Sequence, residues 1–276
     1  MKKLFYAGLA FSMALFFASC SEELGSQTVE DTLAEVTFAV DIESAASTRA
    51  ISDGTGADQL MWAIFNDKGE LIVKKSVIDD ADALLSTQGY SFTTSLAMGV
   101  TYKAVFWAQN PECTAYTVSD DMKVTVDYTG VNNDESRDAF FASSEAFTLK
   151  ASTTISVVLK RPFAQVNVGA YPLDTEIAEQ AGLEIKTSSA TIKAVPDCIN
   201  LFDGSLDGAV DVEYSSSAIP QEGLNVDIDK DGQPETYDWL SMSYILAPKE
   251  GGEYEMSFTF AGENGENSFE FGDGLG

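Results

Sequence analysis

A short acidic segment near the end of the chain has the spacing of a calcium-binding loop. Carboxylates stand at alternate positions, Asp227, Asp229 and Asp231, and Gly232 follows them. Oxygen ligands at this spacing suit Ca²⁺, and glycine permits the sharp bend of such a loop. Asp238 falls at the twelfth position, where Glu is usual, and the flanking residues alternate like strands rather than helices. The segment therefore indicates either a calcium site or an acidic hairpin turn.

Patterns for other site chemistry are weak or missing. The chain contains no histidine, which removes Ser–His and Cys–His nucleophile pairs and the usual proton carrier near neutral pH. Glycosidases work with a pair of carboxylates, but no local arrangement among the 44 acidic residues marks such a pair. Gly54 and Gly56 lack the preceding strand and following helix of a phosphate-binding loop. We expect a protein that is not an enzyme and that carries no cofactor apart from the calcium ion considered above.

The tryptophans and the later cysteines are expected to be structural. Trp62, Trp107 and Trp239 each lie inside a strand pattern, which favours core positions over a surface for stacking sugars. Cys113 and Cys198 lie far apart in sequence, and we expect two free thiols in preference to a disulfide.

The first 20 residues predict export and a lipid anchor. Two lysines precede the uncharged run 4–19, which is shorter than the roughly 20 residues of a membrane span and has the order of a secretory signal. The run ends Phe17-Ala-Ser-Cys20, the pattern of a bacterial lipobox, with Phe where Leu or Val is usual. We expect residues 1–19 to be removed and Cys20 to carry the lipid. The alternative is an ordinary signal peptide with a chance cysteine.

The residues after the signal are strongly acidic. The full chain has 16 basic side chains, two of them in the signal, so 14 remain against 44 acidic ones and the formal charge is −30. Nucleic-acid binding requires basic side chains that displace counterions, and anionic headgroups repel such a surface. We therefore expect no nucleic-acid partner and an acidic tether over residues 20–33. Its first residues, Ser21-Glu22-Glu23, resemble the acidic tag by which Bacteroides-type lipoproteins are sent to the outer face, which implies a body exposed at the outer membrane.

The segment 35–43 predicts the strand around which the N-terminal half is organised. Apolar and polar residues alternate along it, the period of a half-buried strand. We expect it to lie at the edge of a β-sandwich, where another chain could replace it. A segment loose in solvent, or one at the middle of a sheet whose loss collapses the fold, would contradict that exchange. Its apolar residues are Val36, Phe38, Val40 and Ile42.

Three arginines offer sites for a protease. Arg161 precedes proline, a bond that most proteases cut poorly. Arg137 lies in a polar loop that we expect to be open to cutting, although a cut there would split a domain. Arg49 follows the first strand, so a cut after it releases that strand and nothing else. The alternative for Arg49 is a solvated loop residue.

Residues 34–160 have the pattern of an all-β sandwich, with seven to nine short strands separated by turn signals. Turn residues at 66–69 predict a hairpin between two apolar runs, and 101–109 is apolar enough for a central strand. The expected strands beyond 35–43 are 59–65, 70–75, 90–96, 101–109, 123–128, 145–149 and 154–160.

A second sandwich is expected over residues 161–276, with the boundary at Arg161-Pro162. One short helix is predicted from Asp174 to Ala181, capped by Asp174 or Thr175 and followed by Gly182. The fold class is thus two β-sandwiches in tandem, Greek-key or transthyretin-like, with one or two short helices. The expected strands are 163–169, 183–186, 190–195, 210–214, 224–228, 237–246, 254–260 and 268–271.

Together these features resemble the fimbrillin family of Bacteroidales, the subunits of type V pili. The resemblance spans nearly the whole chain. It is carried by the lipobox, the strand before Thr48-Arg49-Ala50, the run Ala57–Phe65 with Gly69–Ile72, and the junction Lys160–Asn167.

The resemblance implies a mode of assembly. Such proteins arrive as lipoproteins, and an arginine-specific protease removes the anchor with the first strand, which exposes an apolar groove that a strand from a neighbouring subunit fills. Arg49 is then the processing site and Ala50 the new first residue. Family members usually carry a C-terminal donor strand, whereas this sequence ends in Gly272–Gly276, so we expect either a truncated sequence or an accessory or anchor subunit.

Two other classes of protein remain as alternatives. A carbohydrate-binding surface lipoprotein would need two or more tryptophans exposed on one face. A secreted hydrolase would need a cleft in which two carboxylates face each other at catalytic separation.

Overall fold

The structure is a computed structural model that describes residues 32–43, 56–78, 85–248 and 250–272. Cys20, Arg49 and Ala50 lie outside these ranges, so lipidation and processing stay predictions. Among the described residues, no helix is long and apolar enough to cross a membrane.

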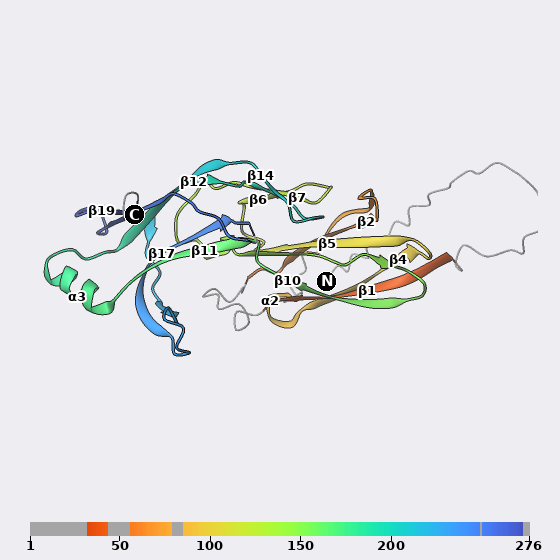
Figure 1. Ribbon diagram of the computed structural model, residues 1–276, viewed down its shortest axis with the longest axis horizontal. Helices are drawn as coiled ribbons and strands as arrows, with labels where there is room; N and C mark the ends of the chain where they lie inside the picture. Colours follow the sequence, from red (N-terminus) through yellow and green to blue (C-terminus); the bar gives the residue numbers. More distant parts are fainter. Residues whose placement is uncertain (1–31, 44–55, 79–84, 249, 273–276) are drawn as a thin grey trace, which may run out of the picture. The chain divides into compact units, whose positions relative to one another are not determined.

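The described chain is almost entirely β-structure, as predicted (Figure 1). An N-terminal sandwich is built from a three-stranded sheet in the order β10-β1-β4 and a sheet in the order β3-β2-β5-β8, with β9 also pairing with β5. Its elements are β1 (Leu33–Ile42), β2 (Gln59–Asn66), β3 (Leu71–Ile78), α2 (Leu85–Gln88), β4 (Tyr90–Ala97), β5 (Thr101–Gln109), β8 (Ala139–Ser143), β9 (Phe147–Thr148) and β10 (Thr153–Leu159).

A second group of strands forms the C-terminal sandwich, from the sheets β11-β17-β16 and β15-β12-β18-β19. The predicted tandem sandwiches are thereby confirmed. The elements are β11 (Phe163–Ala170), α3 (Pro172–Gln180), β12 (Thr187–Val195), β15 (Val210–Ala218), β16 (Gly223–Val226), β17 (Glu235–Leu246), β18 (Met256–Ala261) and β19 (Phe269–Gly272).

A further four-stranded sheet, in the order β14-β13-β7-β6, draws strands from both halves of the chain. Here β7 pairs antiparallel with β13, which lies beyond the predicted boundary at 160/161. The division of the chain at that boundary stays a prediction. The strands are β6 (Tyr116–Val118), β7 (Lys123–Val126), β13 (Cys198–Asn200) and β14 (Leu206–Asp207), and the short 3-10 helix η2 (Glu135–Arg137) follows β7.

Two apolar cores lie on the two faces of the β3-β2-β5-β8 sheet. Leu60, Ile64 and Phe106 belong to a core shared with β1, whereas Phe65 and Trp107 face a larger core that also contains residues of the C-terminal sandwich. Burial on both faces explains why β2 and β5 are nearly continuous apolar runs rather than alternating ones. The predicted central position of β5 is borne out, since it lies between β2 and β8.

The single predicted helix exists but begins earlier than expected. It starts at Pro172 and ends at Gln180, and Tyr171 at the N-cap makes no side-chain capping bond. Proline suits the first helical position because its missing N–H has no partner there in any case. Gly182, just past the end, has φ +84°, as expected for a helix C-terminus.

Candidate functional site

The first strand, β1, lies in the middle of its sheet. It pairs in parallel with β10 from Val36 to Ile42 and antiparallel with β4 from Leu33 to Val40 (Figure 1). The predicted edge position is therefore wrong. The alternating pattern specifies which side chains face the core, but it carries no information on which strands flank the segment.

The inward side chains of β1 are buried as predicted. Val36 and Phe38 are 0% exposed and Val40 is 1% exposed, while Ile42 is half-buried. The Phe38 ring lies 5.5 Å from that of Phe92 and 5.3 Å from that of Phe106, between centroids. Burying four side chains of this size contributes on the order of 6–12 kcal/mol before opposing terms are counted.

The other face of β1 is polar and accessible. The Thr37 and Thr93 hydroxyls lie 2.9 Å apart across the β1–β4 pair, and the Glu35 amide donates to the Ser152 hydroxyl oxygen at 3.2 Å. These hydrogen bonds add to the backbone pairing of β1, but the side chains on this face are not buried in a core. The sheet therefore has one core face and one outer face.

Removing β1 would leave a slot bounded on both sides. Among the described strands, β4 and β10 pair only with β1. Both would present unpaired N–H and C=O groups along a strip of apolar side chains, and such groups are costly to leave unsatisfied. A replacement strand must consequently satisfy two neighbours at once.

Arg137 is buried, so the expectation that it is open to cutting is wrong. Its side chain donates to the Asp127 carbonyl oxygen at 2.9 Å and to the Thr129 carbonyl oxygen at 2.6 Å. It also lies 3.5 Å from the Asp134 carboxylate and 5.1 Å above the Tyr214 ring. The residue is only 5% exposed. The polar loop folds around its guanidinium instead of presenting it to solvent.

Arg161 is also held by the fold. Its Nε and Nη2 donate to the two carboxylate oxygens of Asp138, each at 2.8 Å. The guanidinium stacks 4.7 Å above the Phe140 ring. Both described arginines are thus engaged in ion pairs and ring contacts, and a protease would meet neither as a free loop residue.

The predicted calcium loop forms the turn of the β16–β17 hairpin. Single carboxylate oxygens of Asp227, Asp229 and Asp231 lie within 4.8 Å of one another. Each also accepts a backbone N–H within the turn, for example Gly232 N–H to Asp227 at 3.0 Å. Asp238 is not part of this cluster, because its carboxylate accepts a hydrogen bond from the Thr175 hydroxyl. The hairpin turn is observed, and calcium binding stays a prediction.

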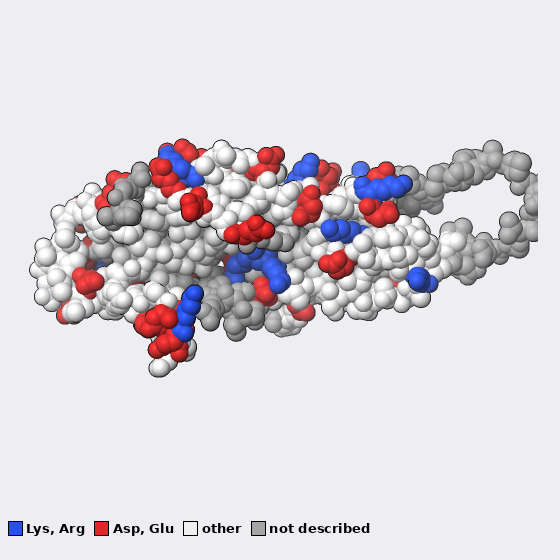
Figure 2. Space-filling view, viewed as in Figure 1, with Lys and Arg blue, Asp and Glu red and all other residues white. Residues whose placement is uncertain are grey.

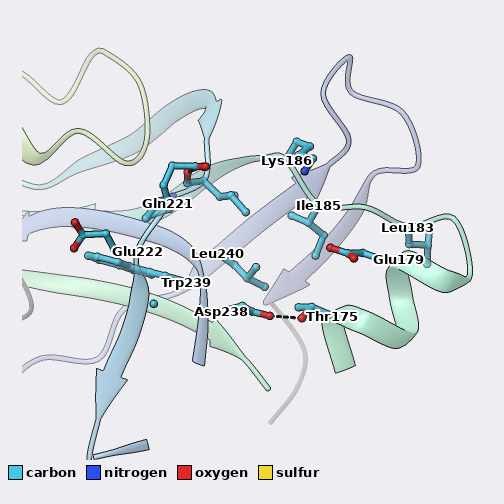
Figure 3. A pocket seen from close by; sticks show the side chains of 13 residues that line it. Thr175, Glu179, Leu183, Ile185, Lys186, Gln221, Glu222, Asp238, Trp239 and Leu240 are labelled. Carbon is cyan, nitrogen blue, oxygen red and sulfur yellow. Dashed lines mark hydrogen bonds between the residues drawn. The ribbon is translucent and has the colours of Figure 1, made fainter. Parts of the chain in front are cut away.

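Asp238 lines a hollow of about 290 Å³ between α3, the segment just before β12, the β15–β16 connection and β17. Figure 3 shows Glu179 and Glu222 approaching it from different sides, with Asp238 turned toward Thr175. Ile185 and Leu240 supply apolar lining. Because Glu179 and Glu222 lie on different sides of the hollow and Asp238 is bonded to Thr175, no two of these carboxylates face each other in Figure 3 as a glycosidase pair would.

Tryptophans do not provide a sugar-binding surface. Trp62, Trp107 and Trp239 are 8%, 0% and 4% exposed, which confirms their predicted core positions. The carbohydrate-binding alternative in its two-tryptophan form therefore loses its support. Cys113 and Cys198 are both free, as expected, and burial raises the pKa of each thiol.

A second hollow, which the sequence did not indicate, opens beside α3. We call it the tyrosine hollow and define it by Asn167, Tyr171, Asp174, Val226, Ile228 and Tyr237. The Tyr171 and Tyr237 rings lie 5.0 Å apart between centroids, although the residues are far apart in sequence. Only a β11–β17 pairing in known register would have brought them together.

Charged side chains on the face shown in Figure 2 are scattered in small groups of both signs. No continuous basic surface appears on that face among the described residues.

Solved structures of similar fold include two from Bacteroides thetaiotaomicron. One is a candidate polysaccharide-binding protein (DUF1812) of Bacteroides thetaiotaomicron, 12% identical, covering 85% of this chain and 78% of that chain, with a TM-score of 0.52. Another is a candidate adhesin of the same organism, 13% identical, with the same coverage and a TM-score of 0.50.

A weaker match is the fimbrial anchor protein Mfa2 from Porphyromonas gingivalis. It is 16% identical, covers 87% of this chain and 82% of that chain, and has a TM-score of 0.44, too low to support an inference. The two Bacteroides structures agree with the resemblance to fimbrillins at the level of the fold. No curated protein matches the sequence. A family model does match, over residues 27–271, and the chain accordingly belongs to DUF6562, a family of unknown function.

Proposed function

We propose that this protein is a structural or accessory subunit of a cell-surface fimbria. It is exported as an outer-membrane lipoprotein acylated on Cys20, and it assembles with other pilus subunits by strand exchange after cleavage at Arg49. The observation that carries the proposal is β1, an N-terminal strand that buries Val36, Phe38 and Val40 in the core and whose two backbone edges are both paired. The fold shared with a candidate adhesin supports a role at the cell surface.

The central position of β1 imposes a condition on this assembly. β1 is the only described strand that pairs with β4 and with β10. Cleavage after Arg49 breaks neither this backbone pairing nor the burial of the apolar side chains, so β1 stays bound in its sheet. Exchange therefore requires an incoming strand that displaces β1 progressively, and the rest of the sandwich must stay folded during that step. This condition replaces the simple release expected for an edge strand.

The arginine contacts support Arg49 as the processing site. Arg137 and Arg161 are both held in ion pairs and stacked on aromatic rings. A protease must fit its substrate as an extended, accessible segment, so these two positions resist cutting in the native protein. Arg49 is the remaining one of the three arginines in the chain, and cleavage there gives a mature form that begins at Ala50.

Limited proteolysis tests the processing site. An arginine-specific protease acting on the native full-length protein should make one cut, after Arg49, and the Arg49→Lys variant should stay intact. The two fragments should co-elute in native chromatography and separate only under denaturing conditions. Cleavage at Arg137 or Arg161 at a comparable rate, or spontaneous unfolding after the cut, contradicts the proposal.

Peptide displacement tests the exchange itself. A synthetic peptide with the sequence of residues 33–43 should replace the cut N-terminal fragment, and intact-mass analysis of the native complex reports the swap. The matched control is the same peptide with Phe38→Arg, which cannot bury its central side chain and should displace nothing. Displacement of the cut fragment to the same extent by both peptides argues against a specific slot.

Intact-mass analysis of the protein from its native cell envelope tests processing in the cell. A mature form starting at Ala50 supports processing, whereas only an acylated form starting at Cys20 argues against it.

A further inference from the structure

The tyrosine hollow has the size and lining of a ligand site. Its volume is about 560 Å³, within the 300–1,000 Å³ range typical of small-molecule pockets. Its walls combine aromatic and aliphatic surface, from Tyr171, Val226 and Ile228, with the polar side chains of Asn167 and Asp174. Pockets of this composition bind by apolar contact and use a few polar groups to orient the ligand.

Tyr171 presents an accessible aromatic surface. Its residue is 60% exposed, whereas Tyr237 beneath it is 6% exposed. The two rings are tilted by 53°, and a hydrogen bond between their hydroxyls raises the pKa of Tyr237 to about 12. Tyr237 therefore stays neutral at physiological pH, and the Tyr171 ring faces solvent.

The hollow is preformed by contacts on both sides of Tyr171. Gly169 allows β11 to approach the β16–β17 hairpin closely, because a Cβ atom there would lie 2.8 Å from the Leu224 side chain on β16 and 3.1 Å from that of Tyr237 on β17. On the other side, the Thr175 hydroxyl donates to Asp238 and holds α3 against β17. These contacts fix the position of Tyr171 before any ligand binds, which lowers the conformational entropy cost of binding.

The polar groups indicate the chemical class of the ligand. Among the described residues that line the hollow, none is Lys or Arg and Asp174 is the only charged one. An anionic ligand finds no counter-charge there. The Asn167 amide oxygen accepts from the Trp239 indole N–H at 3.1 Å, which orients its NH₂ group as a donor. A carboxylate acceptor, an amide donor and two hydroxyls match a ligand rich in hydroxyl groups.

We propose that the tyrosine hollow binds a neutral sugar residue of an oligosaccharide. The apolar C–H face of the sugar ring stacks on Tyr171, where aromatic contact contributes without charge. Its hydroxyls donate to Asp174 and accept from Asn167. This site is separate from β1 and its neighbours, so the proposal does not rest on strand exchange.

Binding of defined neutral oligosaccharides to the full-length protein tests the site. Maltoheptaose, cellohexaose, laminarihexaose and mannohexaose are the probes, with isothermal titration calorimetry and saturation-transfer NMR as readouts. We expect saturable binding of at least one probe, and none of hexagalacturonate, an anionic control. Tyr171→Ala should weaken binding by about tenfold or more, and Tyr171→Phe by less, because the ring face remains.

Leu173→Ala is the matched control. Leu173 lies in the first turn of α3, two residues after Tyr171, and is 64% exposed but does not line the hollow, so its truncation should change affinity by less than about twofold. Tyr171 and Leu173 are both exposed, so we expect their variants to fold, and circular dichroism checks this for each of them. The proposal is overturned if no neutral probe binds the native protein, or if Tyr171→Ala binds as tightly as the native protein does.

Discussion

Arg161 and Asp138 form a two-bonded ion pair in which both side chains are nearly removed from solvent, at 11% and 4% exposure. The pair joins the segment just before β8 to the connection between β10 and β11. Breaking a buried pair leaves an uncompensated charge, which is more costly than the pair itself is favourable.

We therefore expect Asp138→Ala to lower the free energy of unfolding by about 3–5 kcal/mol, measured by urea denaturation. The control is Asp211→Ala, which breaks the exposed pair with Lys193 and should leave the urea midpoint nearly unchanged. Similar losses of unfolding free energy in the two variants would show that burial does not determine how much the Arg161–Asp138 pair contributes to stability.

Phe38 is the centre of the β1 interface with the core. Phe38→Ala removes a side chain that is 0% exposed and contacts three other rings, so the free energy of unfolding should fall by about 3–5 kcal/mol. After cleavage at Arg49, the same variant should lose its N-terminal fragment faster in native chromatography. Thr37→Ala, on the opposite face, should do neither. Retention of the fragment at the native rate would contradict the role of apolar burial.

Asn132 ties one loop to two strands of the C-terminal sandwich. Its NH₂ group donates to the hydroxyls of Ser188 and Ser241, at 3.1 and 2.7 Å, and its carbonyl oxygen accepts from Ser243 at 2.6 Å. Asn132→Ala removes the partner of the Ser241 and Ser243 hydroxyls, whereas Ser188 keeps its bond from Asn133, and the change should cost about 1–3 kcal/mol.

The exposed Asn225→Ala, which loses only a bond from Thr236, serves as the comparison. A double-mutant cycle between Asn132→Ala and Ser243→Ala isolates the interaction energy between these two side chains, which we expect to be about 0.5–3 kcal/mol. Strict additivity would show that the network does not act as a unit.

Alkaline pH should destabilise the fold through buried tyrosines. Burial raises the pKa of Tyr128 and Tyr214 above the unfolded value of 10.0. A raised folded-state pKa means that this stability is fully present below pH 10 and is lost as the pH rises above it. Phenolate absorbance at 295 nm should therefore show these two residues titrating only as the protein unfolds.

Tyr128→Phe checks the assignment, since it removes one of the two groups. The slope of stability against pH above pH 10 should become shallower, although the variant also loses the bonds to Pro196 and Leu246. An unchanged slope would exclude Tyr128 as a source of alkaline unfolding.

Side-chain alternation and turn residues predicted many of the individual strands and turns. They did not predict which strands, far apart in the sequence, pair with one another. Alternation located β1 and its buried side chains, and turn residues located the β2–β3 hairpin. The same alternation could not show that β10, more than a hundred residues later, pairs with β1. Side-chain period is a property of one strand, whereas sheet order depends on every other strand.

The candidate sites show the same limit. Arg137 looked accessible because its neighbours in sequence are polar, yet it is satisfied largely by the backbone carbonyls of residues 127 and 129. Any residue type supplies such acceptors, so composition gives no warning of them. The tyrosine hollow was missed because Tyr171 and Tyr237 meet only through strand pairing.

The strand pairing of β1 also has a direction. β1 runs with β10 and against β4, so a donor that reproduces both sets of hydrogen bonds enters with one polarity only. If one subunit donates the strand and the next accepts it without returning its own, the joint is heterologous, that is, head to tail. Repetition of the joint would give a filament with distinguishable ends, in which the acceptor slot is open at one end alone.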